Sequence, residues 1–354
     1  MKKQMNRNAK GFSLIEIMVA MAIFTIVAGA AFTLFSRHQA LFSQQQDTVS
    51  MSLSLRNALN QMQIDMSNAG TGVFVGANVP NWPIGITVVN NNPGGGCYNA
   101  GTQTYGANCF DMMHILVADP NIPPLHPEDI GANCVSTTSS IVFAQPATGL
   151  TPAQTAALFQ NGDVILLVKA DGSQMSAVTL TSNGSVSGPK VQLQHNPTGA
   201  NGVGNDPYQI TTNPNNKLGT TFCNNDWLVK LQAITYRVDT ATDPTNPRLV
   251  RVRAGQTDVV TDQIVGFRIG VSLWNQVLAS SSEAYNYDAS TYGDPPGSSP
   301  FDFTLIRSVR LMLIGRTRPN LEASYRFRNS FDNGPYQIQP VSLVVNPRNL
   351  SLRD

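Results

Sequence analysis

The chain contains 354 residues, of which 13% are charged, and its 23 basic and 22 acidic side chains give a formal net charge of +1. A chain of this length can bury one large core or two modest ones. The near-neutral balance argues against general electrostatic binding to nucleic acid, which depends on an excess of positive charge.

The first eleven residues form a short basic leader. It contains Lys2, Lys3, Arg7 and Lys10, and no acidic residue precedes Glu16. Basic residues next to a membrane span favour the cytoplasmic side, so we expect the leader to stay in the cytoplasm and the remainder of the chain to be exported. The remainder has 19 basic and 22 acidic side chains, which gives it a formal charge of −3.

An uncharged apolar run, residues 17–35, follows directly after Glu16. At about 1.5 Å per residue, a helix of this length spans a hydrocarbon core of about 30 Å. An ordinary secretory signal has a shorter apolar region of about 7–15 residues, and a plain membrane anchor does not explain a carboxylate at its start. Because a carboxylate within the membrane costs about 2.5–3.5 kcal/mol, Glu16 needs a partner.

Cleavage between Gly11 and Phe12 would supply this partner. Phe12 would become the N-terminus, and Glu16 the fifth residue of the mature chain. A free α-amino group is a cation near neutral pH, and in a low-dielectric environment it attracts a carboxylate strongly. We therefore expect Glu16 to neutralise the Phe12 ammonium of its own chain or of a neighbouring helix, and so to set the register between helices.

Residues 10–16, Lys-Gly-Phe-Ser-Leu-Ile-Glu, resemble the N-terminus of the type IV pilin and pseudopilin superfamily. In that superfamily the leader ends in Gly before Phe-(Ser/Thr)-Leu-(Ile/Val)-Glu, and every position of this motif is matched here. The resemblance implies cleavage after Gly11 by a prepilin peptidase, followed by methylation of the Phe12 amine.

The helix is predicted to continue past the apolar run, because no proline occurs before Pro80. Its second half carries an apolar stripe at helical spacing, which consists of Met51, Leu55, Leu59, Met62 and Met66. Residues 68–72, Asn-Ala-Gly-Thr-Gly, predict the end of the helix near Ser67. We expect residues 12–36 to lie in the membrane or a filament core, and residues 37–69 to form an amphipathic continuation of the helix that packs against a soluble domain.

Residues 70–354 are predicted to form an exported, β-rich globular domain, since short β-branched runs alternate there with Asn, Gly and Pro turn signals. A hairpin is predicted over residues 164–169 and 175–180. The other clear strands are residues 227–238, 249–253, 264–273 and 303–314. Arginines alternate with apolar residues in 249–253 and 306–311, which predicts strands with one solvated and one buried face.

The predicted fold class is therefore α+β: a pilin fold in which a long N-terminal helix packs on an antiparallel sheet. Residues 182–225 and 280–300 are interpreted as large loop insertions. The second of these is rich in tyrosine, which suits an adaptable contact surface, although a plain loop is the simpler interpretation. The tyrosines concerned are Tyr285, Tyr287 and Tyr292.

The four cysteines, Cys97, Cys109, Cys134 and Cys223, all lie on the exported side of the apolar run. An oxidising compartment would allow two disulfides among three pairings, and Cys97 with Cys109 is the local choice. Free buried thiols are the alternative. A metal site is disfavoured, because the spacing forms no Cys-x-x-Cys pair and the nearby histidines, His114 and His126, complete no compact zinc pattern.

The sequence contains no recognisable catalytic centre and implies no cofactor, because nucleophile-elbow, P-loop and zinc-protease motifs are all missing. Asp111 and His114 could form a metal or acid–base pair, but His114 opens an apolar run and fits a strand residue better. The two carboxylates of residues 239–243, Asp-Thr-Ala-Thr-Asp, could offer oxygens to calcium, and a solvated turn is the preferred interpretation.

The order of the later segments is similar to that of the PilW-type minor pilins. In that family the long helix is followed by a Gly-Asp strand, a Tyr-Arg strand, a Leu-Val-Arg strand, a Val-Gly-Phe segment, a Val-Arg strand and a Leu-Ser-Leu-Arg ending. The matching residues here are 162–164, 236–238, 249–251, 265–267, 308–311 and 350–353.

This resemblance implies a minor type IV pilin that acts in the initiation of pilus assembly and is located at or near the filament tip. Its partners would be the prepilin peptidase, other minor pilins, the major pilin and the inner-membrane assembly platform. Before assembly it would cross the inner membrane once, with its N-terminus in the cytoplasm, and it would later reach the pilus tip at the cell surface. The alternatives are a J-type minor pseudopilin of a type II secretion system and, as a different class, a membrane-tethered periplasmic enzyme.

Overall fold

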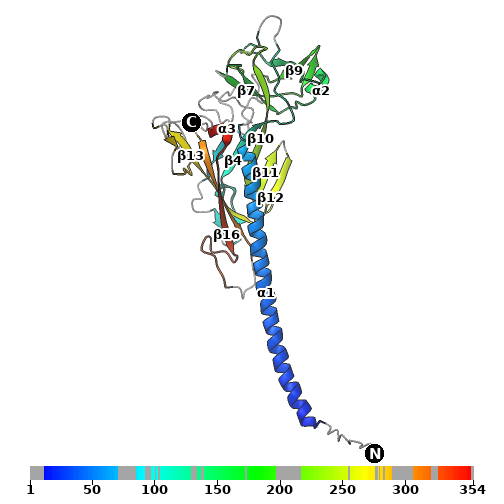
Figure 1. The fold of residues 1–354 in the computed structure, drawn as a ribbon, viewed down its shortest axis with the longest axis vertical. Helices are drawn as coiled ribbons and strands as arrows, with labels where there is room; N and C mark the ends of the chain where they lie inside the picture. Colours follow the sequence, from blue (N-terminus) through cyan, green and yellow to red (C-terminus); the bar gives the residue numbers. More distant parts are fainter. Residues whose placement is uncertain are drawn as a thin grey trace, which may run out of the picture. The chain divides into compact units, whose positions relative to one another are not determined.

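The computed structural model describes residues 12–70, 85–91, 97–99, 101–102, 104–128, 134–136, 139–171, 174–196, 217–253, 256–275, 278, 280–281, 284–288, 306–319 and 326–351. The chain divides into two compact units, Met1–Met51 and Ser52–Asp354. The fold is α+β, with one long apolar helix followed by antiparallel sheets (Figure 1). The predicted fold class is confirmed.

The long helix, α1 (Leu14–Ser67), contains no proline and a single glycine, Gly29. Among the described residues it is the one helix long and apolar enough to cross a membrane, and its most apolar 18-residue window has a mean hydropathy of 2.3 with no buried residue. The predicted stop is also found, because α1 ends at Ser67 and Gly70 adopts a positive φ of 72°. The amide of Gly70 donates a hydrogen bond to the carbonyl of Leu116.

The part of α1 that belongs to the second unit buries the predicted apolar stripe. The buried residues are Leu55, Ala58, Leu59, Met62 and Met66. The helix approaches the strand residue Gly315 so closely that a Cβ built there would lie 2.9 Å from Leu55 Cδ1. A larger residue at this position would therefore require the Leu55 side chain to move. Met51, the first residue of the predicted stripe, is only half-buried.

The larger sheet has seven antiparallel strands. Five follow the order β1 (Ile86–Val89), β4 (Met112–Ala118), β10 (Trp227–Asp239), β11 (Arg248–Arg253) and β12 (Gln256–Thr261). The other two are β6 (Val164–Val168), which pairs with the first residues of β10, and β7 (Met175–Thr179), which pairs with β6. The predicted hairpin is therefore present, and the long strand β10 connects it to the rest of the sheet.

A second sheet has the order β14 (Ser280–Ser281), β13 (Ile264–Asn275), β15 (Ile306–Arg316) and β16 (Ile338–Val345). The apolar residues of β15 alternate with half-buried ones, as predicted. The expectation that the arginine face is solvated was wrong, because aromatic rings cover it. The Arg307 guanidinium lies 5.3 Å from the Trp274 ring centroid, and that of Arg310 lies 5.9 Å from the Tyr285 centroid.

The predicted insertion at residues 280–300 is packed in the part that the structure describes. Ser308 Oγ donates a hydrogen bond to Tyr285 Oη over 3.3 Å. The Tyr287 ring lies over Gly270, where a Cβ would come within 2.6 Å of it. These two tyrosines therefore cover the sheet and do not form a free contact loop. Tyr292 lies outside the described residues.

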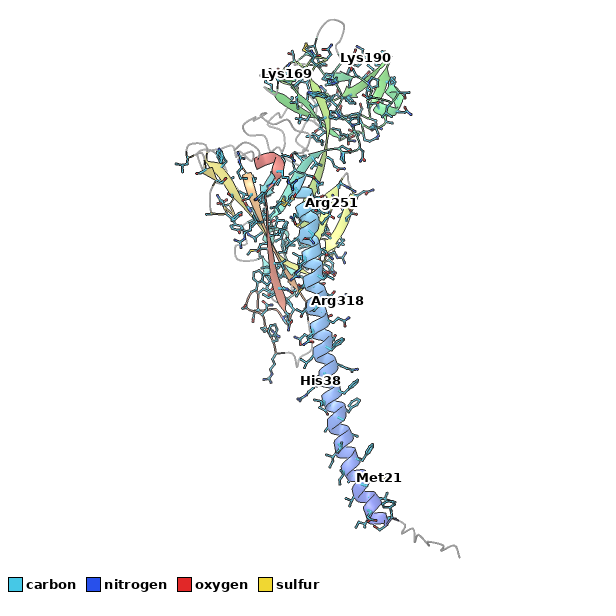
Figure 2. The ribbon with its side chains drawn as sticks, viewed as in Figure 1. Met21, His38, Lys169, Lys190, Arg251 and Arg318 are labelled. Carbon is cyan, nitrogen blue, oxygen red and sulfur yellow. A yellow bond between two sulfur atoms is a disulfide. The ribbon has the colours of Figure 1, made fainter. Side chains whose placement is uncertain are left out.

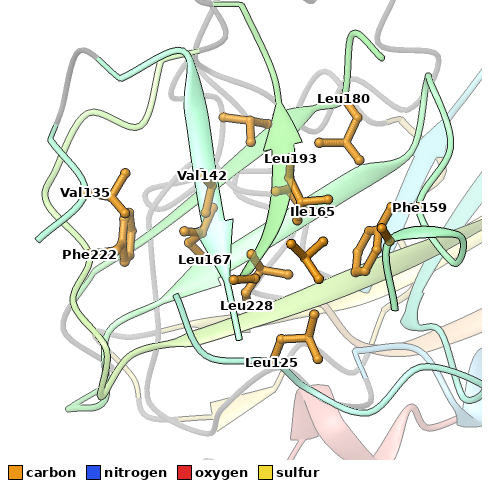
Figure 3. Close-up of a cluster of buried hydrophobic side chains, with 14 of the residues drawn as sticks. Leu125, Val135, Val142, Phe159, Ile165, Leu167, Leu180, Leu193, Phe222 and Leu228 are labelled. Atoms are coloured by element: carbon orange, nitrogen blue, oxygen red, sulfur yellow. The ribbon is translucent and has the colours of Figure 1, made fainter. Parts of the chain in front are cut away.

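The described residues of 119–226 form a lobe inserted between β4 and β10, which we call the inserted lobe. It contains β6 and β7 and the remaining elements β5 (Ile141–Ala144), α2 (Pro152–Ala156), β8 (Ser185–Ser187) and β9 (Lys190–Gln194). Its apolar core (Figure 3), which Leu228 of β10 completes, includes Leu125, Val135, Val142, Phe159, Ile165, Leu167, Leu180, Leu193 and Phe222. The two ends of the lobe are adjacent, since the Asp119 amide donates to the Lys230 carbonyl over 2.8 Å.

The interpretation of residues 182–225 as a loop insertion was therefore wrong in its bounds. β8 and β9 lie within this range, and Leu193, Leu218 and Phe222 belong to the core of the inserted lobe. The inserted segment begins much earlier in the chain, directly after β4. Residues 197–216, which this interpretation included, lie outside the described residues.

A buried ion pair joins α1 to the seven-stranded sheet. Asp65 accepts hydrogen bonds from Arg251 Nε at 2.7 Å, from Arg251 Nη2 at 3.1 Å and from Tyr236 Oη at 2.5 Å. Tyr236 and Arg251 lie opposite each other in the β10–β11 ladder, and Figure 2 labels Arg251 beside the helix. Burial raises the pKa of Tyr236, and its hydrogen bond to Asp65 raises it further.

Asp65→Asn should destabilise the domain by about 3–5 kcal/mol, because it leaves the Arg251 guanidinium buried without its counter-ion. Chemical denaturation of the detergent-solubilised protein measures this. Asp47→Asn, at an exposed residue of the same helix, is the matched control and should change the unfolding free energy by less than about 0.5 kcal/mol. In the double variant Asp65→Asn/Arg251→Met the cost should be smaller than for Asp65→Asn alone. Equal losses in Asp65→Asn and Asp47→Asn would contradict this assignment.

Candidate functional site

The start of α1 is built as a capping box. Phe12 and Ser13 precede the helix, which begins at Leu14. The backbone amide and the hydroxyl of Ser13 both donate to Glu16 Oε2, at 2.9 and 3.1 Å, and the Glu16 amide donates to Ser13 Oγ at 3.2 Å. This reciprocal arrangement satisfies amides that an α-helix leaves unpaired at its first turn.

The capping box gives the Phe-Ser-Leu-Ile-Glu segment a second physical role. Sequence reasoning assigned Glu16 to the Phe12 ammonium and overlooked Ser13, although Ser-x-x-Glu before an apolar run is the sequence signature of this cap. The negative Glu16 also lies at the positive end of the helix dipole. The Glu16 carboxylate therefore has a partner, Ser13, within its own chain before any neighbouring chain is present.

The predicted cleavage site lies directly before this cap. Phe12 is 84% exposed and is not helical, and Gly11 lies outside the described residues. A protease binds its substrate in an extended form, so a bond before the first helical turn can be cut without unwinding α1. The predicted sites of cleavage and of methylation and the capping box thus follow one another within six residues, 11–16.

The structure joins two of the four cysteines. Cys134 and Cys223 form a disulfide with an S–S distance of 1.93 Å, and it links segments of the inserted lobe that are 89 residues apart. Cys97 and Cys109, the pairing chosen from the sequence, are thiols here. The Cys109 thiol donates to the Cys97 carbonyl over 2.8 Å, and burial raises the pKa of Cys109 to about 12.

The Asp111 and His114 side chains belong to different networks. Asp111 is fully buried, accepts from the amides of Asn91 and Ile269, and lies 2.9 Å from Arg268 Nη1. His114 lies on β4, in the interior of the sheet, with its Nδ1 2.9 Å from Thr235 Oγ1. These contacts are structural, since Asp111 connects β4 to β13.

The remaining metal candidates are also occupied by local contacts. Asp239 accepts from the Ala241 amide and the Thr242 hydroxyl, and Asp243 accepts from the amide and hydroxyl of Thr245. His126 Nδ1 lies 2.9 Å from the Asp226 carbonyl. Within the described ranges no group of three or more His, Cys, Asp or Glu side chains could hold a metal ion.

Burial lowers the pKa of His114 from its ordinary 6.5 to about 4. The unfolded chain therefore binds an extra proton between these pH values, so the free energy of unfolding should fall as the pH is lowered from 6.5 to 4. His114→Gln should remove this part of the pH dependence, as measured by denaturation at several pH values. His38→Gln, at an exposed histidine of α1, is the control. An unchanged slope in the His114 variant would show that the buried imidazole does not contribute.

Comparison with known proteins identifies the N-terminal segment. Residues 6–32 match the family described as the prokaryotic N-terminal methylation motif. No curated protein matches the chain. The match contains Gly11, Phe12 and the capping box, and it extends into the apolar run of α1. Together with the membrane-length helix and the antiparallel sheets that follow, this motif supports a type IV pilin-like protein of the pilin and pseudopilin family.

Proposed function

We propose that this protein is a minor type IV pilin that acts in the initiation of pilus assembly and is located at or near the filament tip. The observation that carries the proposal is the methylation motif at residues 6–32, in which the cleavage and cap residues directly precede a membrane-length helix. The helix is the element that would insert first into the membrane and later into a filament core. The β-rich unit would be the exported part.

The chain would first cross the inner membrane once, with its basic leader in the cytoplasm. The Cys134–Cys223 disulfide supports export of the domain, since disulfides persist in oxidising compartments. After cleavage by a prepilin peptidase, the Phe12 amine would be methylated. The protein would then meet other minor pilins, the major pilin and the inner-membrane assembly platform.

Glu16 would act during this docking step. Its capping-box contact with Ser13 holds the carboxylate at the first turn of α1, where the Phe12 ammonium of a neighbouring subunit can reach it. A charge pair in a low-dielectric environment is strong only when the geometry is good, so a pre-positioned carboxylate lowers the cost of pairing. We propose that this role is structural and that the protein is not an enzyme and needs no cofactor.

The inserted lobe supports a position at the tip. A thin filament built around a bundle of N-terminal helices leaves each repeating subunit little lateral room. This chain carries a lobe with its own disulfide and an apolar core that only the first part of β10 shares with the sheet. A subunit with such a lobe has few steric conflicts only where it has few neighbours, as at a filament end.

Mass spectrometry of the membrane-extracted protein should find a mature chain that begins at N-methylated Phe12. Gly11→Val should block processing, because a subsite shaped for glycine has no room for a branched side chain. Ala9→Val, two residues further into the leader, is the control and should still be processed. A mature chain that begins at Met1, or at a site beyond residue 30, would refute the assignment.

Three variants separate the charge of Glu16 from its capping role. Glu16→Gln keeps a capping side chain but removes the charge, Ser13→Ala keeps the charge but removes the cap, and Glu16→Leu removes both. We expect all three to insert into the membrane, and Glu16→Gln and Glu16→Leu to be strongly depleted from sheared pili and from complexes with other minor pilins. Ser13→Ala should assemble at a level closer to that of the parent.

The readout for these variants is quantitative immunoblotting of pili and of cross-linked membrane complexes. Loss of assembly in Ser13→Ala together with normal assembly in Glu16→Gln would reverse the proposed roles. Normal assembly of Glu16→Leu would show that the carboxylate is dispensable.

Deletion of the gene should abolish or sharply reduce surface pili while the major pilin remains at its normal level in the membrane. Sheared pili should contain this protein at far below one copy per major subunit, and labelling should be concentrated at one end. Stoichiometric amounts along the filament would contradict a minor role. Normal pili together with lost protein secretion would favour a J-type pseudopilin instead.

A further inference from the structure

The two thiols lie at the base of a small hairpin formed by β2 (Tyr98–Asn99) and β3 (Thr104–Tyr105). The Gly106 amide extends this ladder by donating to the Cys97 carbonyl over 2.9 Å. The 3-10 turn η1 (Ala107–Cys109) then brings the chain back, and the Cys109 thiol reaches the same Cys97 carbonyl at 2.8 Å. Hairpin and turn together place the Cys109 sulfur against Cys97.

The hairpin carries one side of a buried cation site. The Arg316 side chain is 1% exposed, and its guanidinium lies 5.8 Å from the ring centroid of Tyr105 and 4.8 Å from that of Tyr336. Both tyrosine hydroxyls donate to Asp332. Burial alone would raise the pKa of Asp332, but the hydrogen bonds from Tyr105, Tyr336 and Asn329 hold it below its ordinary value.

Asp332 and Tyr336 lie in residues 326–337, the longer of the two described parts of the segment that connects β15 to β16. The Asn329 side chain holds the turn of this segment, since its Oδ1 accepts from the amides of Phe331 and Asp332. Tyr105 therefore links the hairpin to this C-terminal segment, and Tyr98 of the same hairpin also interacts with Tyr336. Any constraint on the hairpin also constrains this segment.

We propose that Cys97 and Cys109 form a second disulfide in the exported protein, and that this bond fastens the hairpin whose Tyr105 holds Arg316 and Asp332. The proposal rests on the proposed function, because this disulfide can persist only if the domain is exported to an oxidising compartment. The Cys134–Cys223 disulfide is the independent sign that the same domain meets disulfide exchange. The bond would be a covalent modification outside the assembly role, and it would stabilise the segment that contains Asp332 and Tyr336.

The chemistry requires a disulfide-bearing thiol oxidoreductase. Cys97, the half-buried thiol, would lose its proton and attack the disulfide of the oxidoreductase, which forms a mixed disulfide and releases one of its thiolates. Cys109 would then lose its proton and attack the Cys97 sulfur, which releases the second thiolate. Two electrons and two protons pass to the oxidoreductase, which becomes a dithiol. Burial raises the pKa of Cys109 to about 12, so the more exposed Cys97 is the thiol expected to react first.

The full-length protein, extracted from membranes, is first treated with iodoacetamide and then digested without reduction by chymotrypsin, which cuts after Tyr98 and Tyr105. Mass spectrometry should find the Cys97 and Cys109 peptides linked, two hydrogen atoms lighter than the sum of the separate peptides. Alkylation of both cysteines in protein with an intact Cys134–Cys223 bond would overturn the proposal. A link from either one to Cys134 or Cys223 would also overturn it.

A sample in which Cys134 and Cys223 are alkylated as well would instead contradict export, and with it the proposed function. A fresh sample of the purified protein, not treated with iodoacetamide, would then be oxidised with glutathione disulfide. Formation of both bonds under these conditions supports the site, and formation of the Cys134–Cys223 bond alone overturns it. The experiment therefore distinguishes the absence of the Cys97–Cys109 bond from the absence of export.

A stability measurement tests the fastening role. The double variant Cys97→Ser/Cys109→Ser should melt roughly 4–8 °C below the parent under oxidising conditions. The difference should vanish in excess reductant, because the parent then lacks the bond too. A difference that persists after reduction would assign the effect to the thiol–carbonyl hydrogen bond and contradict the disulfide.

Discussion

The contact on which the arrangement of the β-rich unit depends is the buried pairing of Asp65 with Arg251 and Tyr236. A carboxylate and a guanidinium taken out of water are tolerated only in good geometry, so the helix cannot rotate or slide without large cost. Three turns earlier, the close approach of Leu55 to Gly315 holds the same helix against the second sheet. One polar contact and one steric contact thus orient the helix on both sheets.

Much of this architecture could be predicted from local patterns in the chain. The helix follows from an unbroken stretch without proline, its buried face from apolar spacing, and the β6–β7 hairpin from two β-branched runs around a turn. Asp65 could not be predicted in the same way. A carboxylate next to Met66 is normally interpreted as solvated, and its partner Arg251 is 186 residues away in the chain.

The inserted lobe and the N-terminal cap were missed for different reasons. Strand pairing around β10 is non-local, so nothing in residues 182–225 indicated that β9 shares a core with residues of β6. The cap was readable, because Ser13 and Glu16 have the required spacing. The cost of a carboxylate in the membrane indicates a cationic partner, the Phe12 ammonium, and says nothing of the Ser13 contact. A polar group at a helix start can satisfy two partners in succession, and the sequence interpretation considered only the Phe12 ammonium, of the same chain or of a neighbour.

The backbone hydrogen bond between Asp119 and Lys230 gives the inserted lobe a further property. The lobe begins after β4 and ends before β10, and these two strands are neighbours in the sheet. The strands β1, β4, β10, β11 and β12 can therefore pair as they would if a tight turn joined β4 to β10. Insertions at such sites are tolerated because the surrounding backbone keeps its hydrogen bonds. The lobe can therefore diverge, or be exchanged for another module, while the helix and its sheet stay compatible with the same neighbours. The surface of the inserted lobe could therefore change in evolution without a change in the packing of α1 on the sheet.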